Sequence, residues 1–135
     1  MEDLKLQAND KTLYTVLDTI EKHLDENDCP ADVKAEILIA AEEIYVNIAH
    51  YAYGGHEGEA VVQMEVCQDP KCCRVVFRDK GVPYNPLEKE DPDTSLSAMD
   101  REIGGLGIFM VKQSMDKVEY WYEDGCNVLM IEKNL

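Results

Sequence analysis

The spacing of apolar residues divides the first part of the chain into one strand and two helices. Residues 4–8 alternate between apolar and polar side chains, which predicts a short strand. Asn9 or Asp10 can cap a helix that runs to about residue 27, and Pro30 suits the first turn of a second helix reaching about residue 53. The apolar stripes, spaced by three and four, are Leu13, Val16, Leu17, Ile20 and Leu24 in the first helix and Val33, Ile37, Ala40, Ile44 and Ile48 in the second.

The rest of the chain is predicted to form two hairpins separated by a loop and a helix. Residues 60–67 and 72–79 are strands joined by the turn signal Asp69-Pro70-Lys71. A long loop rich in proline and charge then lasts to Ile103, and loops of this length are often functional. A third helix spans about residues 104–115. Strands at 117–123 and 127–133 form the last hairpin, around Asp124-Gly125.

This order of elements predicts an α+β fold. Strands come in hairpins and helices in blocks, which is typical of a two-layer α/β sandwich. We expect a mixed sheet covered by helices on one face and solvated on the other. The length of 135 residues fits a single domain, residues 1–135, and no internal repeat or linker is visible.

Charge and hydropathy narrow the classes of partner. The net charge is -15, from 28 acidic and 13 basic residues, whereas nucleic-acid binding needs clustered Lys and Arg. We therefore expect no direct nucleic-acid partner. No stretch of about 20 apolar residues predicts a membrane span. The acidic start Met1-Glu2-Asp3 does not resemble a secretory signal, so a cytoplasmic location is expected.

The five cysteines are expected to be reduced thiols, because nothing suggests an oxidising compartment. Cys67, Cys72 and Cys73 do not have the paired spacing of a zinc site.

The first group of candidate functional residues lies on the second predicted helix. Glu43, Asn47 and His50 are spaced by four and three, so they share one face. A carboxylate and an amide one turn apart suit a hydrated magnesium ion, and a carboxylate near a phosphate can act as a general base. Taken alone, a polar helix face in water explains the same residues.

The second group surrounds the end of a predicted strand. Asp79 is in phase with Val75 and Phe77, so its carboxylate points toward the core and needs a donor partner. The exocyclic amine of adenine is a suitable donor, and Gly81 would allow a ligand to approach the backbone. A simple strand-ending turn is the alternative.

The third group is Gly104, Gly105 and Gly107 at the start of the third predicted helix. Glycines there expose free N–H groups and the positive end of the helix dipole, which favour phosphate. The segment lacks the ending of a P-loop, and no strand directly precedes it as in a dinucleotide fingerprint. A glycine-rich helix entry without a ligand is the alternative.

Together, the three motifs resemble the Bergerat-fold, or histidine-kinase-like, ATPase superfamily. The motifs E-x-x-x-N, D-x-G-x-P and G-G-x-G occur in that order. Within the superfamily the whole chain is similar to the anti-sigma factor serine kinases of bacterial partner-switching systems. Residues 79–87 resemble their first glycine box, and residues 104–118 resemble the second, including its Met-Asp-x-Val exit.

The resemblance implies ATP and Mg²⁺ as cofactors and a role for each matching residue. Glu43 would be the general base that activates a serine hydroxyl, Asn47 the magnesium ligand, and Asp79 the adenine-recognition residue. Arg101 would reach a phosphate, an inference from its charge and place alone. The implied nucleotide-binding set is Asn47, His50, Asp79, Gly81, Arg101, Gly104, Gly105 and Gly107, with the last three glycines shaping a mobile lid.

Two positions depart from the superfamily pattern. Pro83 stands where the wider superfamily has its second glycine, although many of the small kinases resemble this chain there. Met130 is assigned to the place on the last strand where relatives often carry a threonine that assists adenine recognition, which weakens the expectation of tight nucleotide binding.

The function implied by the resemblance is an ATP-dependent protein serine kinase. Its partners would be an anti-anti-sigma-type protein as substrate, a sigma factor or similar target that it sequesters, and a second copy in a homodimer. The alternative is a nucleotide-gated binding switch that transfers nothing, but such a switch would not need the base Glu43. A detached histidine-kinase domain would need a phospho-accepting helix pair, which the sequence lacks.

Overall fold

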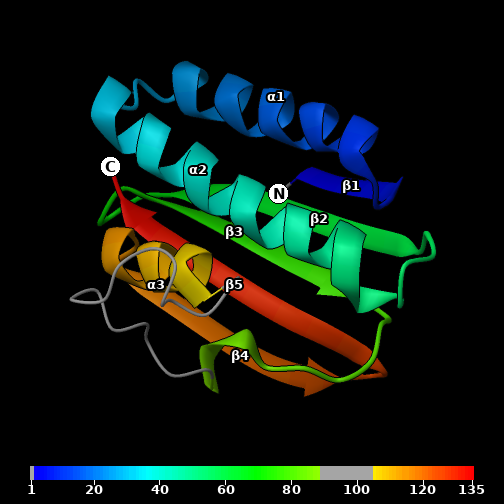
Figure 1. Ribbon diagram of the computed structural model, residues 1–135. Coiled ribbons are helices and arrows are strands. Elements are labelled where there is room, and N and C mark those ends of the chain that lie inside the picture. The colour runs from blue at the N-terminus through cyan, green and yellow to red at the C-terminus, as the bar shows by residue number, and fades with distance from the viewer. Residues whose placement is uncertain (1, 89–104) are drawn as a thin grey trace.

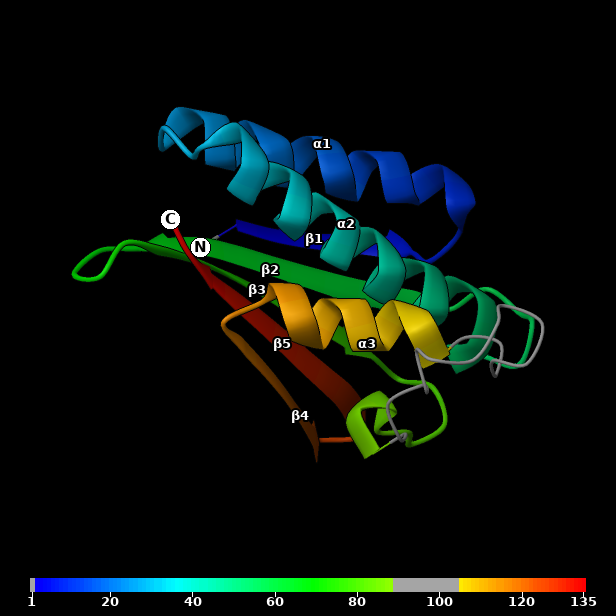
Figure 2. The same cartoon turned by 60° about the vertical axis from the view of Figure 1, so that its left-hand side comes forward.

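The computed structural model, which describes residues 2–88 and 105–135, is a two-layer α+β sandwich. In this described part, all three α-helices lie on one face of a single five-stranded sheet (Figures 1 and 2). The predicted fold class is confirmed. The elements are β1 (Glu2–Gln7), α1 (Asp10–Glu26), α2 (Ala31–Asn47), β2 (Glu59–Cys67), β3 (Cys72–Asp79), α3 (Gly105–Ser114), β4 (Lys117–Glu123) and β5 (Cys126–Asn134).

The sheet has the strand order β1-β2-β3-β5-β4, and every neighbouring pair is antiparallel. The sheet is therefore antiparallel throughout, and the prediction of a mixed sheet is wrong. The connection from β3 through α3 to β4 does produce two strands of the same direction. However, β5 returns from the last hairpin and lies between them, so no parallel pair becomes adjacent.

The helices are held on the sheet by the apolar stripes that the sequence predicts. Asn9 caps α1: its side chain accepts from the backbone of Lys11 and Thr12, each at 2.9 Å, and the Thr12 hydroxyl accepts from the Asn9 N–H. Helix α2 packs between α1 and α3. The fully buried side chains include Tyr45, Phe77, Ile20, Leu24, Ile37, Ile131, Val16, Val62 and Val75.

The second helix changes its geometry near its end. Instead of continuing as an α-helix to residue 53, α2 ends at Asn47 and passes into a π-helical turn, η1 (Ile48–Ala52). Such π turns insert one extra residue into the helical repeat and are frequent at functional sites. The apolar spacing from Ile44 to Ile48 fits an α-helix equally well, so it gives no sign of this turn.

The sheet face opposite the helices carries a small apolar cluster of its own. Val76, Val128 and Met130 are buried there, with Trp121 and Cys126 packed beside them. Charged side chains flank this cluster: Arg74 donates to Glu132 at 2.7 Å and to Glu65 at 3.1 Å. The expected solvated face is thus polar at its margins and apolar at its centre.

The cysteines are unpaired in the structure, as expected. Burial raises the pKa of Cys73 to about 12, and burial together with the neighbouring Glu65 and Cys72 raises the pKa of Cys67 to about 11. Among the described residues, no helix has the length and apolar character needed to cross a membrane.

Candidate active site

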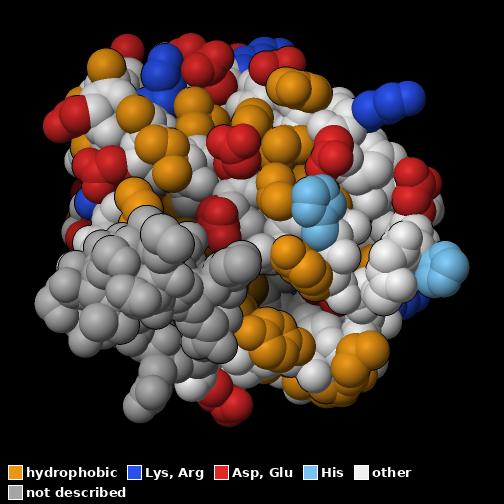
Figure 3. All heavy atoms as spheres, in the orientation of Figure 1, with side chains coloured by type: hydrophobic (Ala, Val, Ile, Leu, Met, Phe, Trp, Pro, Cys, Tyr) orange, Lys and Arg blue, Asp and Glu red, His pale blue; other side chains and the backbone are white. Residues whose placement is uncertain are grey.

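A cavity of about 580 Å³ opens on the helix side of the sheet, where α2 and η1 end. Figure 3 shows a hollow on this face, bordered by hydrophobic side chains. We call it the Asp79 cavity, after the carboxylate at its wall. Its lining includes Asn47, Tyr51, Phe77, Asp79, Val82, Pro83, Tyr84, Ile108, Tyr120, Asn127 and Leu129.

Asp79 reaches the cavity from the end of β3 and is only 7% exposed. Its Oδ1 accepts two hydrogen bonds, from the Gly81 N–H at 2.9 Å and from Asn127 Nδ2 at 3.0 Å. No described residue donates to Oδ2. One oxygen therefore fixes the carboxylate, and the other is left as an acceptor for a donor in the cavity.

Asn127, at the start of β5, forms hydrogen bonds to β3, to the loop that follows β3, and to β4. Its Nδ2 also donates to the Val82 carbonyl at 3.0 Å, and its Oδ1 accepts from the Tyr84 N–H at 3.0 Å and from the Tyr120 hydroxyl. Burial raises the pKa of Tyr120 from its ordinary value, so its hydroxyl is a hydrogen-bond donor at neutral pH, as any unperturbed tyrosine would be. Sequence reasoning missed Asn127, and only the pairing of Asp79 with Asn127 in the β3–β5 register reveals it.

The assignment of Met130 to the adenine-assisting position is wrong. Met130 pairs with Val76 and lies in the apolar cluster on the opposite face of the sheet. It is three residues after Asn127, and an odd offset along a strand reverses the side-chain direction. The residue beside Asp79 is Asn127, so Met130 has no bearing on nucleotide affinity through this cavity.

Gly81 holds the turn after β3 against η1. A Cβ at this position would lie 2.1 Å from the Ala52 carbonyl oxygen and 2.7 Å from its carbon. The next residue, Val82, donates its N–H to the same carbonyl at 3.2 Å. The glycine is needed because two backbones approach closely here, and it positions Asp79 relative to the end of η1.

Gly81→Ala is expected to destabilise the protein by about 1–3 kcal/mol, because a backbone carbonyl cannot move aside as a side chain can. Gly107→Ala provides the contrast and should cost less, since the nearest atoms to its Cβ would belong to the end of the Glu43 side chain, with Oε1 at 1.9 Å. Urea unfolding of both variants measures the difference. Equal stability of Gly81→Ala and the parent would show that the turn is loosely packed.

Glu43 and Asn47 lie one helical turn apart on α2, at a boundary between two depressions. Asn47 lines the Asp79 cavity, whereas Glu43 lines a groove of about 380 Å³ between α2 and α3. Asn47 Nδ2 donates to Glu43 Oε1 at 3.4 Å, so Asn47 Oδ1 is directed away from this contact. Both side chains are half-buried. The structure brings this predicted pair together as the helix spacing indicates.

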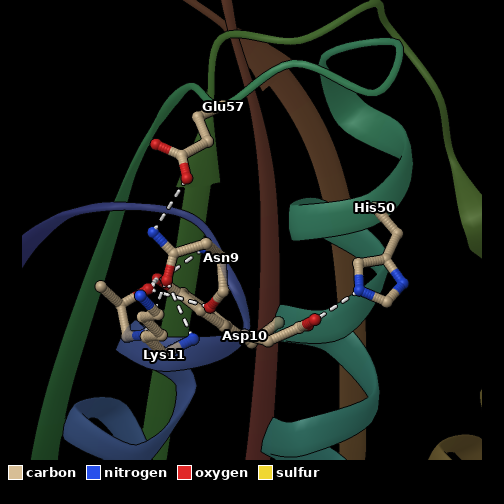
Figure 4. Close-up of polar contacts among 7 residues, drawn as sticks. Asn9, Asp10, Lys11, His50 and Glu57 are labelled. Carbon is tan, nitrogen blue, oxygen red and sulfur yellow. Dashed lines mark hydrogen bonds and ion pairs between the residues drawn. The ribbon is translucent and has the colours of Figure 1, made fainter.

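His50 takes a different direction from Glu43 and Asn47. Its Nε2 lies 2.8 Å from Asp10 Oδ1 at the start of α1, and it does not line the Asp79 cavity. Figure 4 shows the ring pointing from η1 toward Asp10, beside the Asn9 cap. In this structure His50 links α1 to η1, and a role in nucleotide binding stays a prediction.

The glycines of the third motif are only partly described. Gly105 is the first residue of α3, and Gly107, in its first turn, lies against the Glu43 carboxylate. Gly104, Arg101 and residues 89–103 of the loop predicted to act as the lid lie outside the described residues. Within the described part, no cluster of three or more His, Cys, Asp or Glu side chains is placed to hold a metal ion.

Comparison with known proteins agrees with this geometry. The model of the histidine kinase-like ATPase domain matches residues 6–133. The chain belongs to this family. Across 100 residues it is 30% identical to the serine-protein kinase RsbW of Listeria monocytogenes, covering 70% of the chain and 62% of that protein. It is 26% identical over 102 residues to the serine/threonine-protein kinase BtrW of Bordetella bronchiseptica, covering 75% of the chain and 70% of BtrW.

Two solved structures share the histidine kinase-like fold at low sequence identity. The RsbU and RsbW domains of Rv1364c from Mycobacterium tuberculosis match with a TM-score of 0.68 and 16% identity, covering 100% of this chain and 33% of that one. The SiaB–SiaC complex from Pseudomonas aeruginosa matches with a TM-score of 0.65 and 15% identity, covering 100% and 90%. At these identities the two structures support the fold alone. The curated RsbW relative is matched over 62% of its length, so the chain spans less than two thirds of that protein.

Proposed function

We propose that this chain is an ATP-dependent protein kinase that transfers the terminal phosphate of ATP to a serine of an anti-anti-sigma-type protein. One observation carries the proposal: Glu43, which lines the α2–α3 groove, accepts from Asn47, which lines the Asp79 cavity. The cavity suits a nucleotide, and the groove gives a second reactant access to the same carboxylate. The names of the curated relatives support a kinase.

Adenine would bind at the Asp79 end of the cavity. Asp79 Oδ2 is the acceptor left over after Gly81 and Asn127 have fixed Oδ1, and the adenine amine is a donor. The surrounding wall is apolar and aromatic, as is usual for sites that bind a planar ring, with Phe77, Tyr120 and Leu129 among its members.

The phosphates would extend toward Asn47 and α3. Asn47 Oδ1 is a hard oxygen ligand of the type that Mg²⁺ prefers, and its amide is oriented by Glu43. Magnesium, when bound with the phosphates, would neutralise their charge. Glu43, on the far side of Asn47 from the adenine end, would accept the proton of the attacking hydroxyl.

We further propose, from the family resemblance, that the protein sequesters a sigma factor or similar target and forms a homodimer. These two proposals are independent of the chemistry at Glu43. The competing function is a nucleotide-gated switch that binds partners without phosphoryl transfer. The two functions differ in one measurable outcome, because only the kinase modifies its partner.

Nucleotide binding is expected in the micromolar range and is tested by calorimetric titration of ATP and ADP with and without magnesium. At about 100-fold its dissociation constant, a ligand should add about 2.7 kcal/mol of stability, visible as a higher melting temperature. Absence of both heat and stabilisation at millimolar nucleotide would contradict the proposal. Incubation with radiolabelled ATP and purified anti-anti-sigma-type proteins of the same genome then separates kinase from switch.

A further inference from the structure

The α2–α3 groove differs from the Asp79 cavity in its chemistry. It is lined by three carboxylates, Glu36, Glu42 and Glu43, of which Glu36 is already paired with Lys133 at 3.3 Å, and its described lining contains no Lys or Arg. A polyphosphate would be repelled there, in a protein whose net charge is already -15. The groove is therefore unsuited to ATP and suited to a reactant that is neutral or positively charged.

Two large apolar side chains stand exposed on the walls of this groove. Ile39 on α2 is 58% exposed and Met110 on α3 is 52% exposed. Single exposed apolar residues are ordinary, but these two face the same groove from two helices, with Val46 also in its lining. Their arrangement offers an apolar contact for an incoming side chain, with carboxylates around it.

One side-chain contact connects the groove with the Asp79 cavity. Glu43 is part of its lining and accepts from Asn47, which belongs to the Asp79 cavity. In phosphoryl transfer, the attacking and leaving oxygens lie roughly in line on opposite sides of phosphorus. A nucleotide entering from the cavity and a hydroxyl entering from the groove would satisfy this requirement at the Glu43–Asn47 pair.

We infer that the α2–α3 groove is the docking site for the serine-bearing segment of the protein partner. The segment places an apolar side chain between Ile39 and Met110, a Lys or Arg beside Glu42, and its serine hydroxyl at Glu43. The hydroxyl oxygen bonds to the terminal phosphorus, ADP leaves, and the proton passes to Glu43. This inference rests on the proposed kinase function and adds where the partner binds and what it must carry.

The test is the steady-state kinetics of phosphoryl transfer to purified anti-anti-sigma-type proteins of the same genome. Ile39→Ser and Met110→Ser should each raise the KM for the protein partner roughly tenfold, as expected for loss of a buried aliphatic contact. The KM for ATP should stay within about twofold, because neither residue lines the Asp79 cavity. Glu42→Lys should raise the partner KM and weaken its dependence on salt.

Tyr122→Ser is the matched control, since Tyr122 is exposed on β4 and lies in neither depression. If the parent transfers phosphate and the groove variants keep the parental partner KM, the docking inference is wrong while the kinase function stands. If the parent modifies none of these proteins, the kinase function fails and the inference fails with it. Equal KM changes for Tyr122→Ser would also overturn the assignment to the groove.

Discussion

Glu43→Gln is expected to slow phosphoryl transfer by about 10²–10⁴-fold while ATP affinity remains close to the parental value. The proposed role of Glu43 is to accept a proton in the transition state, and an amide cannot do so. The substitution preserves shape, so it fits against Gly107, and it retains an oxygen that can accept from Asn47 Nδ2. Loss of an interaction made only in the transition state lowers turnover without weakening ground-state binding.

The measurement combines single-turnover phosphoryl transfer with calorimetry of ATP binding. Glu119→Gln makes the same chemical change on β4, where Glu119 pairs with Lys117 at 3.4 Å, and should leave both quantities unchanged. Asn47→Ala should lose nucleotide affinity as well as activity, because Asn47 is the proposed metal ligand. Transfer at the parental rate by Glu43→Gln would refute the proposed base and leave the cavity assignment intact.

Much of the fold is readable from the sequence because the deciding interactions are local. The helical spacing of Leu13, Val16, Ile20 and Leu24 predicts the buried face of α1, and Asn9 marks its start. The strand β4 has the predicted bounds. In each case the signal lies within a few residues of the element that it predicts.

The features that sequence reasoning missed depend on how distant segments meet. Asn127 is an ordinary residue at the start of a strand, and its role arises from contact with Asp79, 48 residues earlier. The face of Met130 depends on the β3–β5 register, which the local pattern does not contain. The position of β5 between β3 and β4 is likewise a property of the whole sheet.

In the candidate site, too, local features are predictable from the sequence and features that depend on distant contacts are not. The spacing of Glu43 and Asn47 on a helix predicts that they lie together, and the structure agrees. That they line separate depressions depends on how α3 packs against α2, which the sequence does not reveal. The same packing places Gly107 against Glu43, where a Cβ would lie 1.9 Å from Oε1 unless the Glu43 side chain moved.

Asp79→Asn is expected to reduce ATP affinity by about 100-fold or more, with little change in the fold. The direction of the new amide is determined by its neighbours. Oδ1 of Asp79 accepts from the Gly81 N–H and from Asn127 Nδ2, so the amide oxygen must take that position to satisfy both donors. The amide nitrogen then replaces Oδ2 and presents a donor to the adenine amine, which is itself a donor.

The same geometry predicts a reversal of base preference in Asp79→Asn. Such a reversal would distinguish a change in base recognition from a loss of folding stability. Inosine triphosphate carries an acceptor oxygen where ATP carries the amine, so Asp79→Asn should bind it better than ATP, whereas the parent should prefer ATP. Calorimetric titration of both nucleotides into both proteins gives the comparison.

Asp116→Asn is the matched control, because Asp116 accepts from the Asn134 N–H at 2.7 Å and does not line the cavity. Unchanged ATP affinity in Asp79→Asn would remove Asp79 from adenine recognition. A loss of affinity for both nucleotides together with a lower melting temperature would instead assign Asp79 to holding the β3 turn, through the two hydrogen bonds that its Oδ1 accepts.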